Sequence, residues 1–438
     1  MAQELIQVDT RKLPVRIVFI LVIAIATVWS YYAFRWFFGN TMAEYFNTGQ
    51  NNLQLAQIAH SLSPNDPLTN WRLGQVEQKR LPIDQSASAL AEYERAVSLS
   101  PNDYRYWMSL GVAREQAGEV DAAEQALRQA IALAPAYSYP HWYLGNLLLR
   151  RGRYDEGFIE LRTAGESDPS ELGTQYFNLM SQVYEHDVES LKRAVGPNAE
   201  TRAQFALYLL TQNKRDEGLA IWQTLKADEK KANKEVGDSI VSNLVNNLHF
   251  RDGVLIWNEL APTSAYRVEE GRITDGSFEE LISYGPDVAF GWQVKNVPNV
   301  QIGIDPTVGY EGERSLRLLF QVRTKLDAIN VSQLIPVASE TNYDFEYFFK
   351  TSKLQSGGAL MVQVFDASNG SVLASSPSAP TGDSDWTRVA LTFKTAKNTE
   401  AVRLQVTKGP CGGEGEDNLI CPIFGTVWYD NFSLKRHD

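Results

Sequence analysis

Two cysteines and five histidines are the residues of this chain that could carry metal or redox chemistry. Cys411 and Cys421 lie in the stretch GPCGGEGEDNLICP with nine residues between them, so they form no Cys-x-x-Cys redox motif. Zinc needs about four ligands, which two thiols do not supply. The acidic residues between the cysteines lack the regular oxygen spacing of a calcium loop. A disulfide remains, and it requires an oxidising compartment.

The other residues that could do catalysis show no catalytic spacing. The histidines are His60, His141, His186, His249 and His437, and no two of them form an HExxH motif. The chain has no phosphate-binding glycine loop followed by Lys-Ser or Lys-Thr, and no Gly-x-Ser-x-Gly nucleophile turn. We therefore expect a protein that is not an enzyme and requires no cofactor. The alternative is an enzyme with a carboxylate pair in its C-terminal half.

Length and charge bound the remaining functions. A chain of 438 residues allows roughly two to three domains. Its formal net charge of -12 argues against nucleic acid as a partner, because affinity for phosphates comes largely from Lys and Arg. We expect no nucleic-acid binding.

The N-terminus contains an apolar segment long enough to cross a membrane. Residues 17–34 carry no charge, and Trp36, Phe37 and Phe38 extend the run to the roughly 20 residues that a spanning helix needs. The end of the segment is bulky, unlike the small-residue cleavage site of a signal peptide. We predict a cytoplasmic tail over 1–14 and a transmembrane helix over 15–38.

The flanks of this segment predict its orientation. Arg11, Lys12 and Arg16 precede it, whereas Arg35 alone follows it closely. Positive charge stays in the cytoplasm, so we expect a single-pass protein of the inner (cytoplasmic) membrane with its bulk in the periplasm or otherwise outside the cytoplasm. Trp36 would then lie in the aromatic interfacial belt, and Arg35 would extend outward. In that space the two cysteines can form a disulfide worth roughly 2 to 3 kcal/mol.

A repeat fills most of the first half of the chain. Residues 104–135 align with 138–169, and the paired Leu-Gly dipeptides at Gly111 and Gly145 are 34 residues apart. Residues 70–101 fit the same frame with a short insertion, and weaker copies extend it over about 50–262. The pattern resembles the tetratricopeptide repeat. The resemblance implies an α-solenoid over 39–264 whose small residues, such as Gly157, Gly218 and Gly253, lie where helices cross.

A solenoid of this kind has a groove that binds proteins. By resemblance, its walls are built by residues beside each Leu-Gly pair: Trp71, Gln75, Met108, Val112, Trp142, Asn146 and Arg150. Trp71 and Trp142 can equally pack against adjacent repeats. Trp107 matches instead the tryptophan that this family places between helices.

The second half alternates apolar and polar residues over short segments, as β-strands do. The stretches DGSFEE, FGWQV, GYEGERSLRLLF and VWYDNFSL, in this order, resemble the jelly-roll carbohydrate-binding modules. The resemblance implies a β-sandwich over 265–438 and a structural calcium held by Glu279 and Asp430, with carbonyls near Glu313. It also implies glycan contacts, for which Tyr310 and Tyr343 are the candidates.

Three tryptophans of this half, Trp292, Trp386 and Trp428, are expected in the core because they lie inside strand patterns. The predicted fold class is thus multidomain, α then β: one transmembrane helix, an all-α solenoid and an all-β jelly roll. We expect a scaffold or adaptor that binds protein through the solenoid and glycan or protein through the β domain, as in polysaccharide assembly or export. The alternative is an accessory subunit of a membrane complex without sugar binding.

Overall fold

The first compact unit begins with a long helix and continues as a stack of helix pairs. The computed structural model describes residues 11–45, 53–79, 86–185, 187–280, 284–285, 288–295, 300–321, 323–325, 330–356, 360–408 and 420–437. These residues form two compact units, Met1–Gly196 and Pro197–Asp438. The division between the two units is at 196/197, whereas the predicted domain boundary at 264/265 lies inside the second unit, between its last long helix and its first strand.

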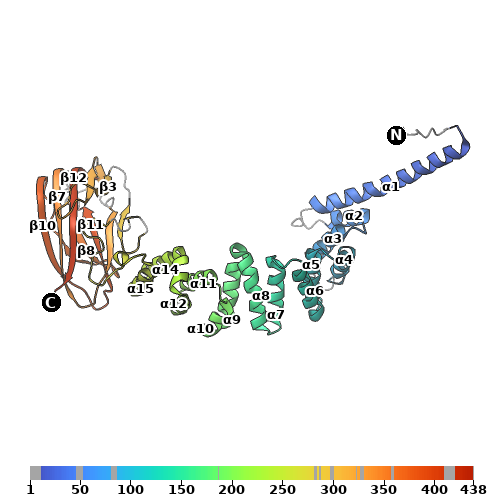
Figure 1. Ribbon diagram of the computed structural model, residues 1–438, viewed down its shortest axis with the longest axis horizontal. Coiled ribbons are helices and arrows are strands. Elements are labelled where there is room, and N and C mark those ends of the chain that lie inside the picture. Colours follow the sequence, from blue (N-terminus) through green and yellow to red (C-terminus); the bar gives the residue numbers. More distant parts are fainter. Residues whose placement is uncertain are drawn as a thin grey trace, which may run out of the picture. The chain divides into compact units, whose positions relative to one another are not determined.

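The first unit is helical throughout its described residues (Figure 1). Its helices are α1 (Leu13–Tyr45), α2 (Leu53–Leu62), α3 (Pro67–Lys79), α4 (Ser86–Leu99), α5 (Tyr104–Gln116), α6 (Val120–Leu133), α7 (Ser138–Arg150), α8 (Tyr154–Ser167), the π-helical turn η3 (Pro169–Gly173), α9 (Thr174–Tyr184) and α10 (Val188–Val195).

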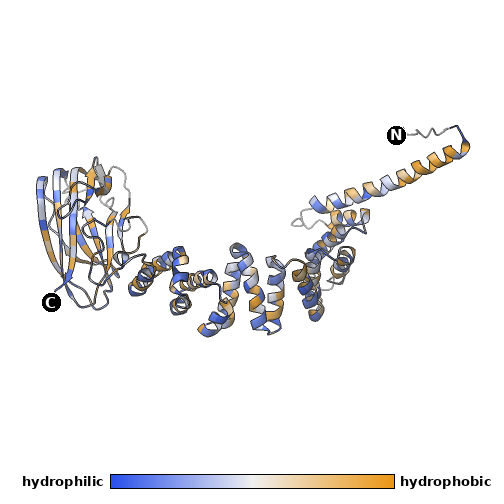
Figure 2. Ribbon diagram, viewed as in Figure 1, coloured by the Kyte–Doolittle hydropathy of each residue, from blue (hydrophilic) through white to orange (hydrophobic). Residues whose placement is uncertain are grey.

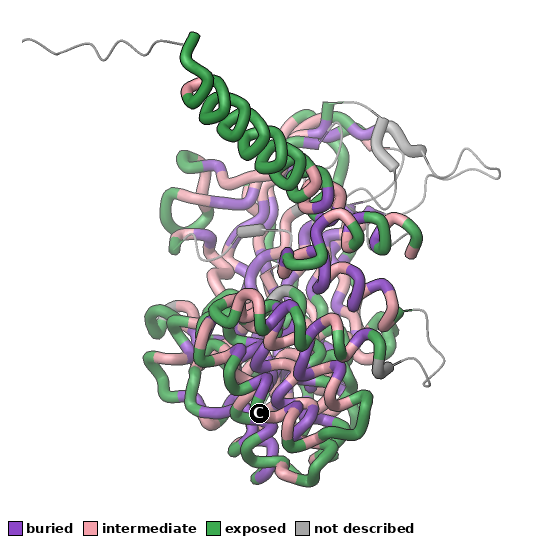
Figure 3. Tube along the Cα trace, turned by 90° about the vertical axis from the view of Figure 1, so that its right-hand side faces the viewer, coloured by how far each residue is buried: buried purple, intermediate pink, exposed green. Residues whose placement is uncertain are grey.

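Helix α1 combines an apolar, exposed part with a packed C-terminal end. It has 33 residues, and its most apolar 18-residue window is not buried at all by the rest of the chain. This window is orange in the hydropathy colouring of Figure 2 and green, for exposed, in Figure 3. The helix does not end near residue 38 as predicted for the span. It continues to Tyr45 and packs against α2 and α3.

The packed end of α1 forms the first helix of the leading helix pair. Gly39 allows the close approach, since a Cβ there would lie 2.5 Å from Ser63 Oγ and 2.9 Å from Ala59 O. Asp66 joins this contact to α3: its Oδ2 accepts from Trp36 Nε1 at 2.7 Å, and its Oδ1 accepts from the Leu68 N–H at 2.8 Å. Arg35 donates to Ser61 O at 2.6 Å, so it does not extend outward as expected.

The later helix pairs are held by the small residues that the repeat predicted. A Cβ at Gly111 would lie 2.6 Å from the Leu127 side chain, and one at Gly145 would lie 2.6 Å from Leu161 and 2.9 Å from Gly157 O. Helices α5 with α6 and α7 with α8 therefore cross at van der Waals distance. This packing confirms the predicted crossing position Gly157.

The second unit starts with further helix pairs and ends in a β-sandwich (Figure 1). Its helices are α11 (Ala199–Thr211), α12 (Arg215–Trp222), α13 (Ala227–Ala232), α14 (Lys234–Asn246), α15 (Phe250–Leu260) and the 3-10 turn η4 (Ser264–Tyr266). Gly218 lies under Ala206 O at the crossing of α11 and α12, and Gly253 lies beside Val245 where α14 meets α15. Both positions agree with the predicted crossings.

The last helix is covered by residues that lead into the sandwich. Phe290 is buried and meets the Trp257 ring edge-on with centroids 5.9 Å apart. The Asn258 side chain donates to Val268 O at 2.9 Å and accepts from the Val268 N–H at 2.8 Å. The apolar end of a solenoid needs such a cover, because no further repeat packs on it.

Two sheets form the sandwich. The strands are β1 (Tyr284–Gly285), β2 (Trp292–Lys295), β3 (Val300–Asp305), β4 (Ser315–Phe320), β5 (Arg323–Lys325), β6 (Asn330–Pro336), β7 (Asn342–Ser356), β8 (Leu360–Asp366), β9 (Val372–Ser375), β10 (Gly382–Lys394), β11 (Ala401–Lys408) and β12 (Ile420–Arg436). One sheet has the order β1-β2-β6-β11-β8-β9, and the other β10-β7-β12-β4-β3 with β5 beside β12. All described pairs are antiparallel except β1 with β2.

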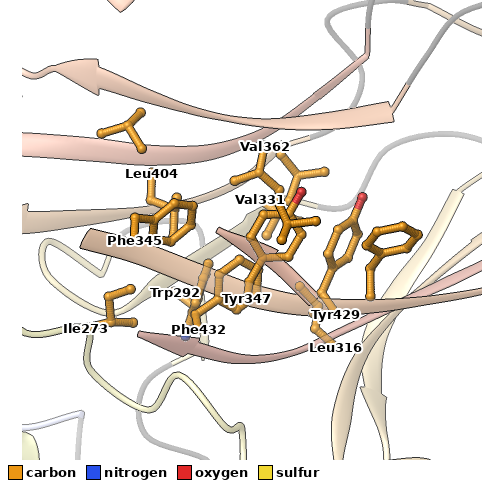
Figure 4. Packing of buried hydrophobic residues seen from close by; sticks show 14 of the residues in the cluster. Ile273, Trp292, Leu316, Val331, Phe345, Tyr347, Val362, Leu404, Tyr429 and Phe432 are labelled. Carbon is orange, nitrogen blue, oxygen red and sulfur yellow. The ribbon is translucent and has the colours of Figure 1, made fainter. Parts of the chain in front are cut away.

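The inner faces of the two sheets enclose one apolar core. Figure 4 shows Phe345, Tyr347 and Tyr429 of one sheet packed toward Val362 and Leu404 of the other. Along β7 and β12, buried residues alternate with less buried ones, as the period of two predicted. The structure confirms the fold class: helices first, then a two-sheet β-sandwich.

Candidate functional site

Four of the seven predicted groove residues are half-buried on α5 and α7, the first helices of two successive pairs. Met108 of α5 is half-buried against the cluster of α6 and α7, and Val112 lies one turn further along the same helix, also half-buried. Asn146 of α7 donates to the carbonyl of Trp142 at 2.8 Å, within its own helix. Trp142 itself is half-buried. These side chains offer a mixed apolar and amide surface.

Trp71 follows the alternative that the sequence left open. It is buried, its ring meets the Tyr106 ring edge-on at 5.6 Å, and its Nε1 donates to Ser109 Oγ at 2.8 Å. Trp71 therefore joins α3 to α5 and is withdrawn from the groove. Trp107 donates to Pro101 O at 2.7 Å and packs against the core between helices, which confirms its predicted place.

Arg150 and Gln75, two of the predicted groove residues, have polar side-chain partners. Arg150 is exposed and makes an ion pair with Glu115 of the preceding repeat at 2.6 Å. Gln78 of α3 donates to Gln116 of α5 at 2.8 Å. Gln75 accepts from Arg72 at 3.0 Å. Glu115 and Gln116 were not among the predicted groove residues, although Gln116 and Arg150 are 34 residues apart and so hold equivalent repeat positions.

A buried histidine links the two helices of the α7–α8 pair. His141 Nδ1 lies 2.6 Å from Glu160 Oε2, and its Nε2 lies 3.1 Å from Pro135 O. The hydrogen bond to Glu160 raises the pKa of His141 against the opposing effect of burial. This ion pair joins α7 to α8, and the second contact joins α7 to the turn that precedes it.

The β-sandwich carries an aromatic cluster on the outer face of the β10-β7-β12 sheet. Tyr310 is 39% exposed and stacks on Phe348 of β7 with ring centroids 3.7 Å apart. Trp386 of β10 meets Tyr310 edge-on at 6.0 Å. Two ion pairs lie on the same sheet: Lys350 with Asp385, and, further along, Arg388 with Glu346.

Three aromatic predictions for this domain are wrong. Tyr343 is 1% exposed and its hydroxyl accepts from the Ala338 N–H at 2.8 Å, so it is a core residue and no glycan contact. Trp386 of β10 and Trp428 of β12 are only partly buried. Trp428 lies on the outer face, since its strand neighbours Val427 and Tyr429 are buried and point inward. Trp386 contacts Tyr310 on that face. Trp292, in contrast, is in the core as expected.

Glu279 and Asp430 come together around one segment, residues 309–314. Asp430 Oδ2 accepts from the Tyr310 N–H at 2.6 Å. Glu279 Oε1 accepts from the N–H groups of Glu313 at 2.9 Å and Arg314 at 2.8 Å. Burial raises the pKa of Asp430 to about 6, and the charge of Glu279 adds to this shift.

This geometry does not supply the ligands that calcium prefers. Ca²⁺ takes about six to eight oxygen ligands. Among the described residues no group of three or more His, Cys, Asp or Glu side chains could hold a metal ion. Three of the four carboxylate oxygens of the pair accept from main-chain N–H groups, which a cation would have to displace. The predicted calcium therefore has no further support from this donor set.

The predicted disulfide lies only partly within the described residues. Cys411 is outside them. Cys421 is in β12, opposite Thr324 of β5, with its side chain not described. The disulfide between Cys411 and Cys421 stays a prediction.

Comparison with known proteins identifies the helical repeats. The family model described as tetratricopeptide repeat matches residues 84–138. These residues are tetratricopeptide repeats. A small glutamine-rich tetratricopeptide repeat-containing protein of Mycosarcoma maydis is 29% identical over 21% of this chain, and a TPR repeat-containing thioredoxin of Arabidopsis thaliana is 32% identical over 18%. The matches span only 26% and 12% of those two relatives.

Solved structures similar to parts of the chain fall into two kinds. A structure titled "Crystal structure of MamA protein" has 20% identity and a TM-score of 0.31, covering 41% of this chain and 95% of its own. A structure titled "CBM4 structure and function" has 13% identity and a TM-score of 0.29, covering 38% and 99%. With scores this low, the fold rests on the repeat packing and strand order described above.

Proposed function

We propose that the protein is a membrane-anchored adaptor that is not an enzyme. One observation carries this proposal: α1 is a single helix whose apolar part is exposed and whose C-terminal end is the first helix of the repeat stack. An exposed apolar helix of this length is stable in hydrocarbon and not in water. The anchor would therefore present the tetratricopeptide repeats directly beside a membrane.

The charges around α1 support a topology with the N-terminus in the cytoplasm. Arg11, Lys12 and Arg16 lie at the start of the helix, whereas Arg35 is held by the repeat stack. The inner-membrane location and a periplasmic bulk follow as parts of the proposal. A fusion of alkaline phosphatase to the C-terminus should be active in this topology. An inactive phosphatase fusion, together with activity of a cytoplasmic reporter fused at the same position, would refute the topology.

The repeats would bind a protein partner along the half-buried residues Met108, Val112, Trp142 and Asn146. Photo-crosslinking tests this surface. A crosslinking amino acid at Met108 or Asn146 should capture a partner in membranes. The same amino acid at Ile159, which is exposed on the second helix α8, is the matched control and should capture less of that partner. Equal capture from all three positions would contradict a groove-specific partner.

The second ligand would be a glycan, because Tyr310, Phe348 and Trp386 form a partly exposed aromatic cluster near the ion pair of Lys350 with Asp385. Aromatic faces stack on the apolar faces of sugars, and paired charges favour a neutral glycan over a charged one. Binding of neutral hexasaccharides by calorimetry is expected to be lost in Trp386→Ala and kept in Phe424→Ala, an exposed aromatic elsewhere in the domain.

A role in polysaccharide assembly or export would join these two activities. Affinity capture from detergent-solubilised membranes tests it. Recovery of glycan-synthesis or export components would support the role. A stable complex without them, together with no sugar binding, would instead support a structural accessory subunit.

A further inference from the structure

Segment 309–314 determines where the exposed aromatic ring of Tyr310 lies. The segment connects toward β4, and Tyr310 is the residue that rests flat on Phe348, with an interplanar angle of 14°. No regular strand or helix includes these six residues, so their position depends on what their main-chain groups contact.

Asp430 holds one end of the segment with both carboxylate oxygens engaged. Oδ2 accepts from the Tyr310 N–H and Oδ1 accepts from the Asn431 N–H, each at 2.6 Å. The residue is fully buried. A buried carboxylate is stable only when its oxygens are satisfied in this way.

Glu279 holds the other end with one oxygen. Oε1 accepts from the N–H groups of Glu313 and Arg314, while the Glu279 carbonyl accepts from Arg314 Nη1 at 2.8 Å. Among the described residues no hydrogen bond reaches Oε2. Gly312, with φ +97°, lies so close that a Cβ there would meet the Glu279 carboxylate.

We infer that Glu279 and Asp430 are positioning residues, which hold segment 309–314 directly through its N–H groups and thereby keep Tyr310 on Phe348. In this arrangement the carboxylates themselves do what a bridging calcium ion was expected to do. The consequence for sugar binding rests on the glycan-binding role proposed above. The hydrogen bonds from Glu279 and Asp430 to the segment do not depend on that role.

The unequal use of oxygens makes the inference testable by conservative substitution. Gln at 279 keeps one oxygen that can accept both N–H groups, so Glu279→Gln should leave the segment in place. Asn at 430 replaces one of two accepting oxygens by an NH₂ group, so Asp430→Asn should release it. A calcium site predicts that either loss of charge weakens the segment.

Hydrogen exchange followed by mass spectrometry on the full chain in detergent measures the outcome. Exchange in peptides covering 309–314 should rise about tenfold or more in Asp430→Asn and in Glu279→Leu, and change little in Glu279→Gln. Unchanged exchange in β8 and β11 shows that each variant is folded. Asp344→Asn, at an exposed carboxylate, is the control for general effects.

Metal and sugar give two separate arms. Addition of EDTA or CaCl₂ to the wild type should leave hydrogen exchange of the segment unchanged. Protection from exchange that EDTA removes and Ca²⁺ restores would overturn the inference. Equal loss of protection in Glu279→Gln and Asp430→Asn would overturn it too. Neutral hexasaccharide binding should fall in Asp430→Asn and persist in Glu279→Gln. If the wild type binds no neutral hexasaccharide but exchange in peptides covering 309–314 changes as expected in the variants, the glycan proposal fails. The positioning role of Glu279 and Asp430 is then still supported.

Discussion

Replacing Gly39 with alanine is expected to loosen α1 from the repeat stack. The added Cβ would lie 2.5 Å from Ser63 Oγ, 2.9 Å from Ser63 Cβ and 2.9 Å from Ala59 O. The last of these atoms is main chain in a helix and cannot move alone. Overpacking of this kind costs about 1 to 3 kcal/mol, here near the upper end, and the better helix propensity of alanine offsets about 1 kcal/mol. The net loss is about 1 to 2 kcal/mol.

Hydrogen exchange of α2 in the detergent-solubilised protein measures this loss. Its amides should exchange about 5- to 30-fold faster in Gly39→Ala. Gly165→Ala is the matched control, because a Cβ at Gly165 makes only ordinary contacts of 3.5 Å with Tyr176. That control should exchange no faster than wild type in α8. Unchanged exchange of α2 in Gly39→Ala would refute the close packing of α1 on the stack.

Three further predictions concern other parts of the chain. His141 has a raised pKa in the fold, so the free energy of unfolding should be highest below about pH 6.5 and fall as the pH rises through that raised value; Glu160→Gln should flatten this dependence in thermal unfolding. Phe290→Ala should cost about 3 to 5 kcal/mol in denaturant unfolding because it uncovers the last helix pair, and the exposed Phe424→Ala should cost far less. Peptide mapping without reductant should recover the two cysteines as one linked pair, and free thiols would count against a location outside the cytoplasm.

The sequence predicted the repeat stack well because its signal is periodic. Gly111 and Gly145 are fixed by the distance between helix axes, and that requirement recurs every 34 residues. The start of the stack was harder. The repeat pattern was recognised from about residue 50, but its first helix was not, because the apolar composition of α1 hides the part that Gly39 and the end of this helix play in packing.

The binding surfaces were predicted less well, because a position in a repeat or strand does not settle which neighbour a side chain meets. Trp71 turned toward Ser109 of the next repeat, and Tyr343 toward the sandwich core. Trp428 could have been placed by alternation with its apolar neighbours Val427 and Tyr429, and Trp386 by counting back from Val389 of its own strand. The pairing of Asp430 with Tyr310 spans 120 residues, and no local pattern announces it.

The uninterrupted course of α1 has a mechanical consequence. A 33-residue helix is about 50 Å long, whereas the hydrocarbon layer is about 30 Å thick. In the topology proposed here, a change in bilayer thickness would alter the tilt of α1. The same helix, unbroken over Leu13–Tyr45, packs directly against α2 and α3. The angle at which the groove meets a membrane partner would then depend on the lipids around the anchor.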